Sequence, residues 1–283
     1  MSYRGPVTKE YVSADFEQFV ARHFGARGRA WLDQLPRQVE RHTREWGLEV
    51  EGFLPGGLMS CCLVVTTTEG EAAVLKLGGP WTPASSEGAA LAAWDGGPAP
   101  KLLRIDAKGN ALLLERIRPA TPFITPHGRG GLDRLAELLS ALHAPALSAE
   151  MERRLPPLEN VVYRLIDTAG AEAAARSAAD ATELQPRLAL ARTRAADLLS
   201  HPEAPTLLHG DLENKNILHC NRRGLVAIDP LPCIGDPTYD AAYWLGLAVQ
   251  VERRDTVARE LAAALSLDPT RLRTWAAVVA LEP

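Results

Sequence analysis

The stretch "LLHGDLENKNILHC", residues 207–220, decides how the fold of this chain is interpreted. It places a polar loop between two apolar segments that both have the composition of short strands. Polar side chains that gather in a loop held between regular elements serve function more often than packing. We therefore interpret residues 209–216 as a functional loop. Besides His209, its polar residues are Asp211, Glu213, Asn214, Lys215 and Asn216.

The bulk composition limits the classes of protein to which the chain can belong. Of its 283 residues 46% are hydrophobic, which is enough for one large domain or two lobes. The net charge of −4 gives no basic footprint for nucleic acid, so we expect a small-molecule partner. The four cysteines form no C-x-x-C pair. No apolar leader and no membrane-length segment is present, so we expect a cytoplasmic protein; its oligomeric state stays open.

The order of the expected elements indicates an α+β fold with an N-terminal lobe, residues 1–115, and a mainly helical C-terminal lobe, residues 116–283. We expect Thr82 to cap a helix whose first residue is Pro83. The other expected elements are helices over 11–46, a strand meander over 48–77, a hairpin over 101–117, a loop over 118–131 and further helices that short strands interrupt around residues 204–230.

Three oxygen-bearing side chains lie at the ends of the strands near the polar loop. Asp211 and Asn216 are five residues apart, and Asp229 ends the next short strand. Mg²⁺ prefers hard oxygen ligands, takes few of them from the protein and receives the rest from phosphates and water. A phosphoryl-transfer site needs such a pair of metal ligands together with a carboxylate that orients the acceptor hydroxyl. The spacing is therefore compatible with a magnesium-nucleotide site.

Lys76 is the only lysine within an apolar strand-like run, "AAVLKL". A buried ammonium group needs a partner, and Glu87 in the following helix can supply one. The alternative is a surface lysine whose ammonium reaches solvent from a strand edge, and Lys76 alone does not decide between the two. Upstream, Gly56 and Gly57 in "LPGGLMS" can bring backbone N–H groups close to phosphates, although a Gly-Gly pair is more often only a turn.

Taken together, the motifs "HGDLENKNIL", "AIDP" and "GDPTYD" resemble the protein-kinase-like fold of the aminoglycoside phosphotransferases. Within them the chain resembles the aminoglycoside 6-phosphotransferase and hydroxyurea phosphotransferase family. The likeness covers nearly the whole chain in order, with "VLKLGGP" similar to the phosphate-lysine strand and "ALLLERI" to the hinge strand. It implies an ATP-dependent kinase that transfers the γ-phosphoryl group to a hydroxyl of streptomycin or hydroxyurea and so gives resistance.

The resemblance also implies roles for single residues around the loop. Asp211 matches the catalytic base, and Asn216 and Asp229 match the ligands of Mg²⁺. Lys76 matches the lysine that holds the α- and β-phosphates of ATP, with Glu87 as the residue that orients it. The remaining residues implied in nucleotide binding are Gly56, Gly57, Ser60, Glu115 and Ile117, the last two at the hinge that holds the adenine.

Three acidic residues near the loop are expected to line the acceptor site, because a guanidinium sugar favours carboxylates. They are Glu213, Asp236 and Asp240. We also expect Asp236 to brace its own loop through backbone N–H groups. Glu213-Asn214-Lys215 stands where the family has a His-Pro-Gly-like triplet, so two charged side chains flank the acceptor. Lys215 has two possible roles: it neutralises phosphate charge, or it lies in solvent. We favour the second, because exposed lysines are the norm.

Several alternatives remain open at this point. The acceptor can be another small hydroxyl metabolite, since one fold serves many substrates. A catalytically silent nucleotide-binding module is a second alternative, and turnover with Mg²⁺ distinguishes it from a kinase. Relatives continue through a further helix after residues 273–280, so we expect a less complete wall around the acceptor. A metal-dependent hydrolase is disfavoured, because the His and Asp residues show no known ligand spacing.

Overall fold

The computed structural model describes residues 11–283 except 56, 58 and 124–128. The chain divides into two compact units, each with its own internal contacts. Unit 1 comprises residues 1–96 and 100–116, and unit 2 comprises residues 97–99 and 117–283. Residues 97–99, which the sequence placed in the N-terminal lobe, group with unit 2 because Ala227 N donates to Pro98 O and Arg223 donates to the carbonyls of Gly97 and Ala99.

Unit 1 contains the antiparallel meander and the hairpin that the sequence predicts. Its sheet has the strand order β1-β2-β3-β5-β4, with each neighbouring pair antiparallel. Within the described residues its elements are α1 (Ala14–Trp46), β1 (Leu48–Phe53), β2 (Ser60–Thr67), β3 (Ala72–Gly78), α2 (Ala84–Trp94), β4 (Leu102–Asp106) and β5 (Ala111–Glu115).

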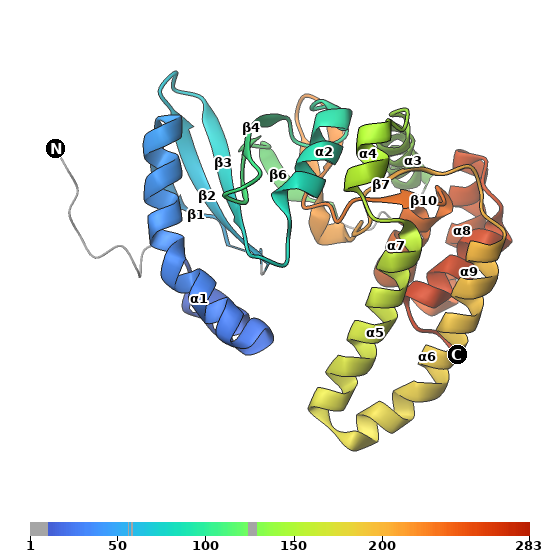
Figure 1. Ribbon diagram of the computed structural model, residues 1–283. Coiled ribbons are helices and arrows are strands. Elements are labelled where there is room, and N and C mark those ends of the chain that lie inside the picture. Colours follow the sequence, from blue (N-terminus) through green and yellow to red (C-terminus); the bar gives the residue numbers. More distant parts are fainter. Residues whose placement is uncertain (1–10, 56, 58, 124–128) are drawn as a thin grey trace. The chain divides into compact units, whose positions relative to one another are not determined.

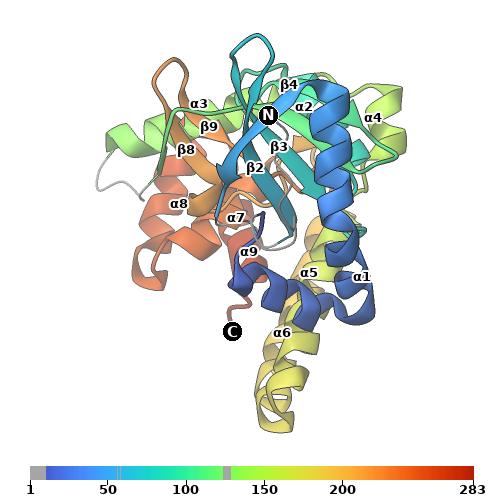
Figure 2. The same cartoon turned by 90° about the vertical axis from the view of Figure 1, so that its left-hand side faces the viewer.

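Helix α1 covers one face of this sheet (Figure 1). Ser13 caps its start by accepting a hydrogen bond from Phe16 N, and Gly47 ends it in the left-handed conformation. Gly25 has a φ of 54°, which bends the helix at that point, and the bend is visible in Figure 2. The apolar stripe of α1 packs on the inward-facing residues of β2, β3 and β5; the buried residues of this core include Phe16, Val20, Trp31, Leu35, Val39, Cys61, Leu63, Leu75, Leu77 and Leu113.

Strand alternation directs Lys76 to the other side of the sheet. Leu75 and Leu77 belong to the core beneath α1, so the side chain between them points away from that core. Helix α2 lies close to β4 and β5 there, because Gly88 has no Cβ; a Cβ at this position would approach Ile105 Cδ1 to 2.4 Å. The close approach brings Glu87, the neighbour of Gly88, within reach of Lys76.

The start of α2 differs from the sequence prediction. The helix begins at Ala84, and the side chain of Thr82 caps nothing; it donates to Gly79 O instead. Asn110, in the turn between β4 and β5, supplies the cap: its Oδ1 accepts from Ala84 N at 2.6 Å. Its Nδ2 donates to the carbonyls of Gly79 and Thr82. Neighbouring sequence could not reveal this cap, because the capping residue lies 26 positions away.

Unit 2 is mainly helical and contains two small sheets. Helices α5 and α6 run antiparallel to each other as a long pair (Figure 1). The described elements are β6 (Pro119–Pro122), α3 (Arg129–His143), α4 (Ala149–Arg154), α5 (Leu158–Arg176), α6 (Ala178–Ser200), β7 (Thr206–Leu208), a 3-10 turn (Asn214–Asn216), β8 (Ile217–Cys220), β9 (Gly224–Ala227), β10 (Cys233–Gly235), α7 (Thr238–Ala248), α8 (Val251–Leu265) and α9 (Pro269–Val279).

One segment that was expected to be a loop contains a strand. β6 pairs with β8, and β8 pairs with β9, so that all three form one antiparallel sheet. The prolines at 119 and 122 are compatible with this arrangement because β6 is an edge strand, where a missing N–H can face away from its partner. Among the described helices of the chain, none combines the length and the apolar character that crossing a membrane requires.

We predict that Asn110→Ala destabilises unit 1. The variant removes the cap of α2 and places alanine at a φ of 53°, so the free energy of unfolding should fall by about 2–4 kcal/mol. Asn110→Gly is the matched control, because glycine adopts this φ without strain and loses only the side-chain bonds. Urea denaturation measures both. An Asn110→Ala protein as stable as the wild type would rule out the capping role.

Candidate functional site

The loop after β7 is short and tied to itself. Glu213 N donates to Asp211 O at 3.0 Å, and Asn216 N donates to Glu213 O at 2.9 Å, which forms the 3-10 turn before β8. Gly210 has a φ of 78°, and a Cβ there would lie 2.1 Å from Leu231 O. Glycine at 210 is therefore required both by its backbone conformation and by the close approach of the segment that follows Asp229.

Asp211 lies at the centre of this loop, and each oxygen of its carboxylate accepts a hydrogen bond. Oδ1 accepts from Tyr243 Oη at 2.8 Å, and Oδ2 accepts from Asn216 Nδ2 at 2.9 Å. Burial raises the pKa of Asp211 to about 6; the hydrogen bond from Tyr243 opposes this rise, and the charge of Glu213 adds to it. The carboxylate is thus poised close to neutral pH and fixed in orientation.

A backbone hydrogen bond ties the residue before Asp229 to Asn216. Asn216 is buried, and its Nδ2 donates to both the backbone O and Oδ2 of Asp211, which leaves Oδ1 as the other polar atom of its amide. Ile228 N donates to Asn216 O at 2.8 Å, so Asp229 follows directly beside it. Asp229 itself has a φ of 56°. An amide oxygen and a carboxylate are both ligand types that suit Mg²⁺.

His209 joins the loop to the strand that delivers Asp229. Its ring is fully buried; Nε2 donates to Ile228 O at 3.0 Å, and Nδ1 accepts from Asp211 N at 3.3 Å. The two bonds are satisfied together by one neutral tautomer, with the proton on Nε2. His209 therefore acts as a structural residue of the loop.

Asp240, on α7, holds the backbone at the start of the loop. Its carboxylate accepts from His209 N at 2.7 Å, from Gly210 N at 2.9 Å and from His143 Nε2 at 3.1 Å, and the residue is fully buried. Burial raises the pKa of Asp240, but the bonds from His143 and the loop outweigh it, so the net pKa is lowered. The expectation that Asp240 contacts the acceptor is corrected, because the residue is fully buried and its carboxylate accepts three hydrogen bonds from the protein.

Asp236 is engaged in the same way. Its Oδ2 accepts from Arg271 Nε and Trp275 Nε1, both at 2.7 Å, and its Oδ1 accepts from Thr238 N at 2.8 Å. The residue is 6% exposed. The bond to Thr238 N matches the expected local brace, and the two bonds to α9 were not foreseen. Because both oxygens serve the interior of unit 2, the expected acceptor contact of Asp236 is also corrected.

Glu213 and Lys215 form an ion pair beside Asp211. Lys215 Nζ lies 2.8 Å from Glu213 Oε1. The side chain of Lys215 is 63% exposed, so solvent reaches it as expected, while Glu213 is 31% exposed. Burial lowers the pKa of Lys215, but Glu213 and the other nearby carboxylates outweigh it and raise the pKa overall. The two charges of the Glu213-Asn214-Lys215 triplet therefore neutralise each other.

Two residues of the site were missed from the sequence, Tyr243 and Trp244. Tyr243 bonds Asp211, and Trp244 Nε1 donates to Asn214 Oδ1 at 2.8 Å. With Asp240 they occupy positions i, i+3 and i+4 of α7, which lie on one face of a helix. That spacing was the available signal: one helix face touches the loop at His209, Asp211 and Asn214.

In unit 1 the expected pair of Lys76 and Glu87 is present. Lys76 Nζ lies 2.7 Å from both Oε1 and Oε2 of Glu87, and both residues are buried. Ser60 Oγ is buried as well and has no hydrogen-bond partner among the described residues. A Cβ at Gly57 would meet only Ser60 O at 3.5 Å, an ordinary contact, so the fold itself does not require glycine there. Gly56 lies outside the described residues.

The two hinge residues are placed at the ends of their units. Glu115 ends β5; its N–H donates to Lys101 O at 2.9 Å, and its Oε2 accepts from Lys101 N at 3.1 Å. Ile117 is buried in unit 2 with Leu218 and Val226. These contacts fix the backbone on either side of the junction. The adenine-binding role of both residues stays a prediction.

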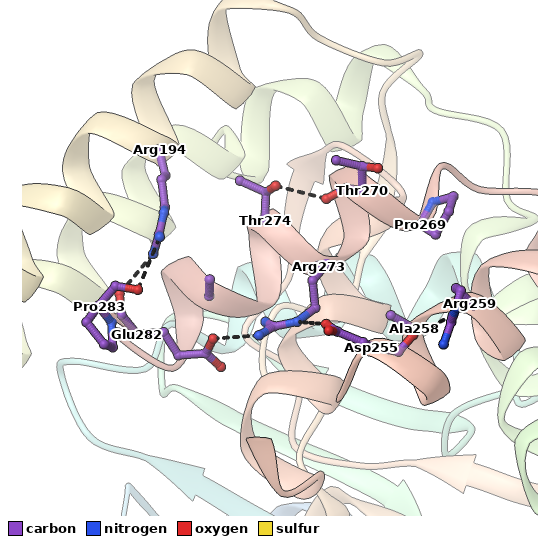
Figure 3. Close-up of a pocket in the computed structure, with 11 residues that line it drawn as sticks. Arg194, Asp255, Ala258, Arg259, Pro269, Thr270, Arg273, Thr274, Glu282 and Pro283 are labelled. Atoms are coloured by element: carbon purple, nitrogen blue, oxygen red, sulfur yellow. Dashed lines mark hydrogen bonds and ion pairs between the residues drawn. The ribbon is translucent and has the colours of Figure 1, made fainter. Parts of the chain in front are cut away.

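A cavity of about 570 Å³ in unit 2 lies away from this loop. Residues of α6, α8 and α9 line it, and Asp211, Asn216 and Asp229 do not (Figure 3). Inside it, Arg273 bonds both Asp255 and Glu282. Its charged groups thus bind each other, and nothing in it resembles a reaction centre.

The two-unit α+β fold, with a buried lysine–glutamate pair in one unit and a His-Gly-Asp loop in the other, defines a kinase-like phosphotransferase. Choline kinase LicA from Streptococcus pneumoniae has the same fold, with a TM-score of 0.59 at 16% identity over 83% of each chain. The expected fold class is therefore confirmed.

The chain matches a family model described as aminoglycoside/hydroxyurea antibiotic resistance kinase over residues 45–282. It is 33% identical to hydroxyurea phosphotransferase of Kitasatospora aureofaciens over 93% of this chain and 76% of the relative. It is 30% identical to streptomycin 6-kinase of Streptomyces glaucescens over 90% of this chain and 83% of the relative. The chain belongs to the aminoglycoside/hydroxyurea antibiotic resistance kinase family, as its motifs indicated.

We predict that Asp240→Ala destabilises unit 2 strongly. The variant leaves two buried N–H groups of the loop without an acceptor, at a cost of about 2–5 kcal/mol in the free energy of unfolding. Asp255→Ala is the control, because that side chain is 79% exposed and its ion pair contributes less than about 1 kcal/mol. Urea denaturation at neutral pH compares them. Equal stability of the two variants would contradict the bracing role.

Proposed function

We propose that the protein transfers the γ-phosphoryl group of ATP to a hydroxyl group of an antibiotic, with streptomycin and hydroxyurea as the first candidates. The observation that carries the proposal is the carboxylate of Asp211: Tyr243 and Asn216 hold it, and the charge of Asp229 acts on it. Phosphoryl transfer asks the protein mainly for positioning and charge neutralisation. Membership of the resistance kinase family supports the same chemistry.

Asp211 acts on the acceptor in this proposal. Each of its oxygens accepts one bond from the protein, and a carboxylate oxygen can accept a second. A hydroxyl that donates to Asp211 is oriented for attack, and its proton passes to the carboxylate as the new ester bond forms. A pKa of about 6 leaves Asp211 ionised at neutral pH and able to accept that proton.

Asn216 and Asp229 are the proposed ligands of Mg²⁺. The amide of Asn216 directs its nitrogen to Asp211, so its oxygen is the group left for a cation, and this orientation suits a metal ligand. When bound there, Mg²⁺ would neutralise the charge that develops on the γ-phosphoryl group of ATP. His209 keeps the two ligands together, since it bonds both the loop and Ile228.

The residues of unit 1 are proposed to bind the nucleotide. Lys76 is fixed by Glu87 and is suited to hold the α- and β-phosphates. The unpartnered Oγ of Ser60 and the unhindered backbone at Gly57 suit a phosphate oxygen, which would give the buried hydroxyl an acceptor. The backbone at Glu115 and Ile117 is proposed to hold the adenine edge.

The charges around Asp211 limit which acceptor compounds suit the site. Asp236 and Asp240 are occupied within the protein, and Glu213 is paired with Lys215. A cationic aminoglycoside therefore finds fewer carboxylates than the sequence suggested. Hydroxyurea is small and neutral and does not need them. Because relatives with both activities match the chain, both compounds belong in the assay.

The test is acceptor-dependent release of ADP from Mg-ATP, with streptomycin, other aminoglycosides and hydroxyurea as acceptors. We expect release with at least one of them. Asp211→Ala should lower that turnover by at least about a thousandfold, the size of loss seen when a catalytic group is removed, and leave ATP binding within a few-fold. Asp255→Ala serves as the control and should keep wild-type turnover.

Two results would contradict the proposal. Wild-type turnover in Asp211→Ala would remove Asp211 from the chemistry. Binding of ATP without any acceptor-dependent release, across an acceptor panel widened to other small hydroxyl compounds, would favour a silent nucleotide-binding module.

We further predict an acidic limb in the pH profile of kcat/KM for Mg-ATP. The raised pKa of Asp211 means that the carboxyl of the free protein keeps its proton up to about pH 6, so activity should fall as the pH drops through that value. The limb of kcat should lie at lower pH, since a bound cation favours the carboxylate. Rates measured between pH 4.5 and 8, with the acceptor well below its KM for the kcat/KM profile and saturating for the kcat profile, test this. A flat kcat/KM over that range would contradict the role of Asp211 as base.

A further inference from the structure

Tyr243 contacts the carboxylate at the centre of the proposed reaction. It lies on α7, one helical turn after Asp240, and is 8% exposed. Its Oη donates to Asp211 Oδ1 at 2.8 Å. Burial and then the charge of Asp211 raise the pKa of Tyr243, so its hydroxyl keeps the proton that it donates.

The bond from Tyr243 completes a two-point support of the carboxylate. Asn216 holds Oδ2, and with Oδ2 alone held the carboxylate could turn about its Cβ–Cγ bond. Tyr243, on α7, holds Oδ1, whereas Asn216 holds Oδ2 from the 3-10 turn, so the plane of the carboxylate is fixed. The second lone pair of Oδ1 then keeps a constant direction, and a hydroxyl that donates to it is aligned in the same way in each turnover.

The neighbouring tyrosine on the same helix makes no comparable bond. Tyr239 is fully buried, and its Oη has no hydrogen-bond partner in the described part of the chain. Its ring packs on the rings of Tyr243 and Trp275, with centroids 5.8 and 5.4 Å away. The two tyrosines thus share a helix and a buried setting and differ in one contact: the hydroxyl of Tyr243 reaches Asp211, and that of Tyr239 reaches no acceptor.

From this geometry we propose that Tyr243 is a positioning residue of the phosphoryl transfer: its hydroxyl fixes the carboxylate of Asp211 toward the acceptor hydroxyl. The inference rests on the proposed function, because it assigns Tyr243 a part in the same reaction. A merely structural tyrosine would contribute to stability alone. A positioning tyrosine affects kcat and leaves the binding of ATP unchanged, since the hydroxyl acts on the acceptor side of the reaction.

The experiment compares Tyr243→Phe with Tyr239→Phe. Each variant removes one buried hydroxyl from α7 and keeps the ring. We expect Tyr243→Phe to lower kcat for acceptor-dependent ADP release by roughly 10- to 100-fold, the range that a small misplacement of a reacting group costs. Its KM for Mg-ATP should stay within about twofold of the wild type. Tyr239→Phe should leave both constants within about twofold, because its hydroxyl has no partner to lose.

A second measurement tests the contact without relying on turnover. In thermal unfolding, Tyr243→Phe should lower the midpoint in the wild-type background and have no such effect in an Asp211→Ala background, where the hydroxyl has already lost its acceptor. Equal shifts in both backgrounds would show that Tyr243 does not act through Asp211. The cycle stays informative even if Tyr243→Phe is destabilised.

The outcomes separate the two levels of the proposal. Full kcat in Tyr243→Phe, with an active wild type, overturns the role of Tyr243 and leaves the proposed function intact. An equal loss of kcat in both phenylalanine variants overturns it too, because α7 would then respond to any lost hydroxyl. A wild type without acceptor-dependent release contradicts the proposed function itself, and the unfolding cycle then decides whether the Tyr243–Asp211 contact exists.

Discussion

The carboxylate of Asp240 accepts the N–H groups of His209 and Gly210, and the geometry of the loop depends on this contact. Gly210 can take its left-handed conformation against Leu231 only if its own N–H has an acceptor inside the protein. The same face of α7 then adds Tyr243 and Trp244, which hold Asp211 and Asn214. One helix face therefore supports the loop along its length, and the carboxylate of Asp211 is placed by a rigid element.

The contacts from α7 offset a cost in folding free energy, because the carboxylate of Asp211 is buried near other carboxylates. Raising the pKa of a carboxyl from 3.8 to about 6 lowers the stability of the folded state by roughly 3 kcal/mol at neutral pH. This destabilisation by Asp211 is absent below about pH 4, where the carboxyl is protonated in the folded and the unfolded state. It reaches its full size as the pH rises through 6. A group kept at such a cost is better explained by chemistry than by packing.

Local sequence predicted the features that depend on short spacing. The strand-like run "AAVLKL" and the helix after it indicated that Lys76 can pair with Glu87, the turn residues predicted the hairpin, and the five-residue spacing indicated that Asp211 and Asn216 serve one site. Prediction from local sequence failed where a residue distant in the chain determines the hydrogen-bond partner. Asn110 caps α2 from 26 residues away, and Asp240 and Asp236 are occupied by donors that only the folded chain supplies. Tyr243 lay on a predicted helix, yet nothing nearby in the sequence showed what its hydroxyl reaches.

The central claim is that the loop directs the phosphoryl group to a hydroxyl acceptor, and ³¹P NMR of the reaction mixture tests it most directly. The protein is incubated with Mg-ATP and with streptomycin or hydroxyurea, and the phosphorus-containing products are followed with time. The account predicts a new resonance of a phosphorylated acceptor that grows in step with ADP. Inorganic phosphate in step with ADP, with no phosphorylated acceptor, would show hydrolysis in place of transfer and would contradict the account.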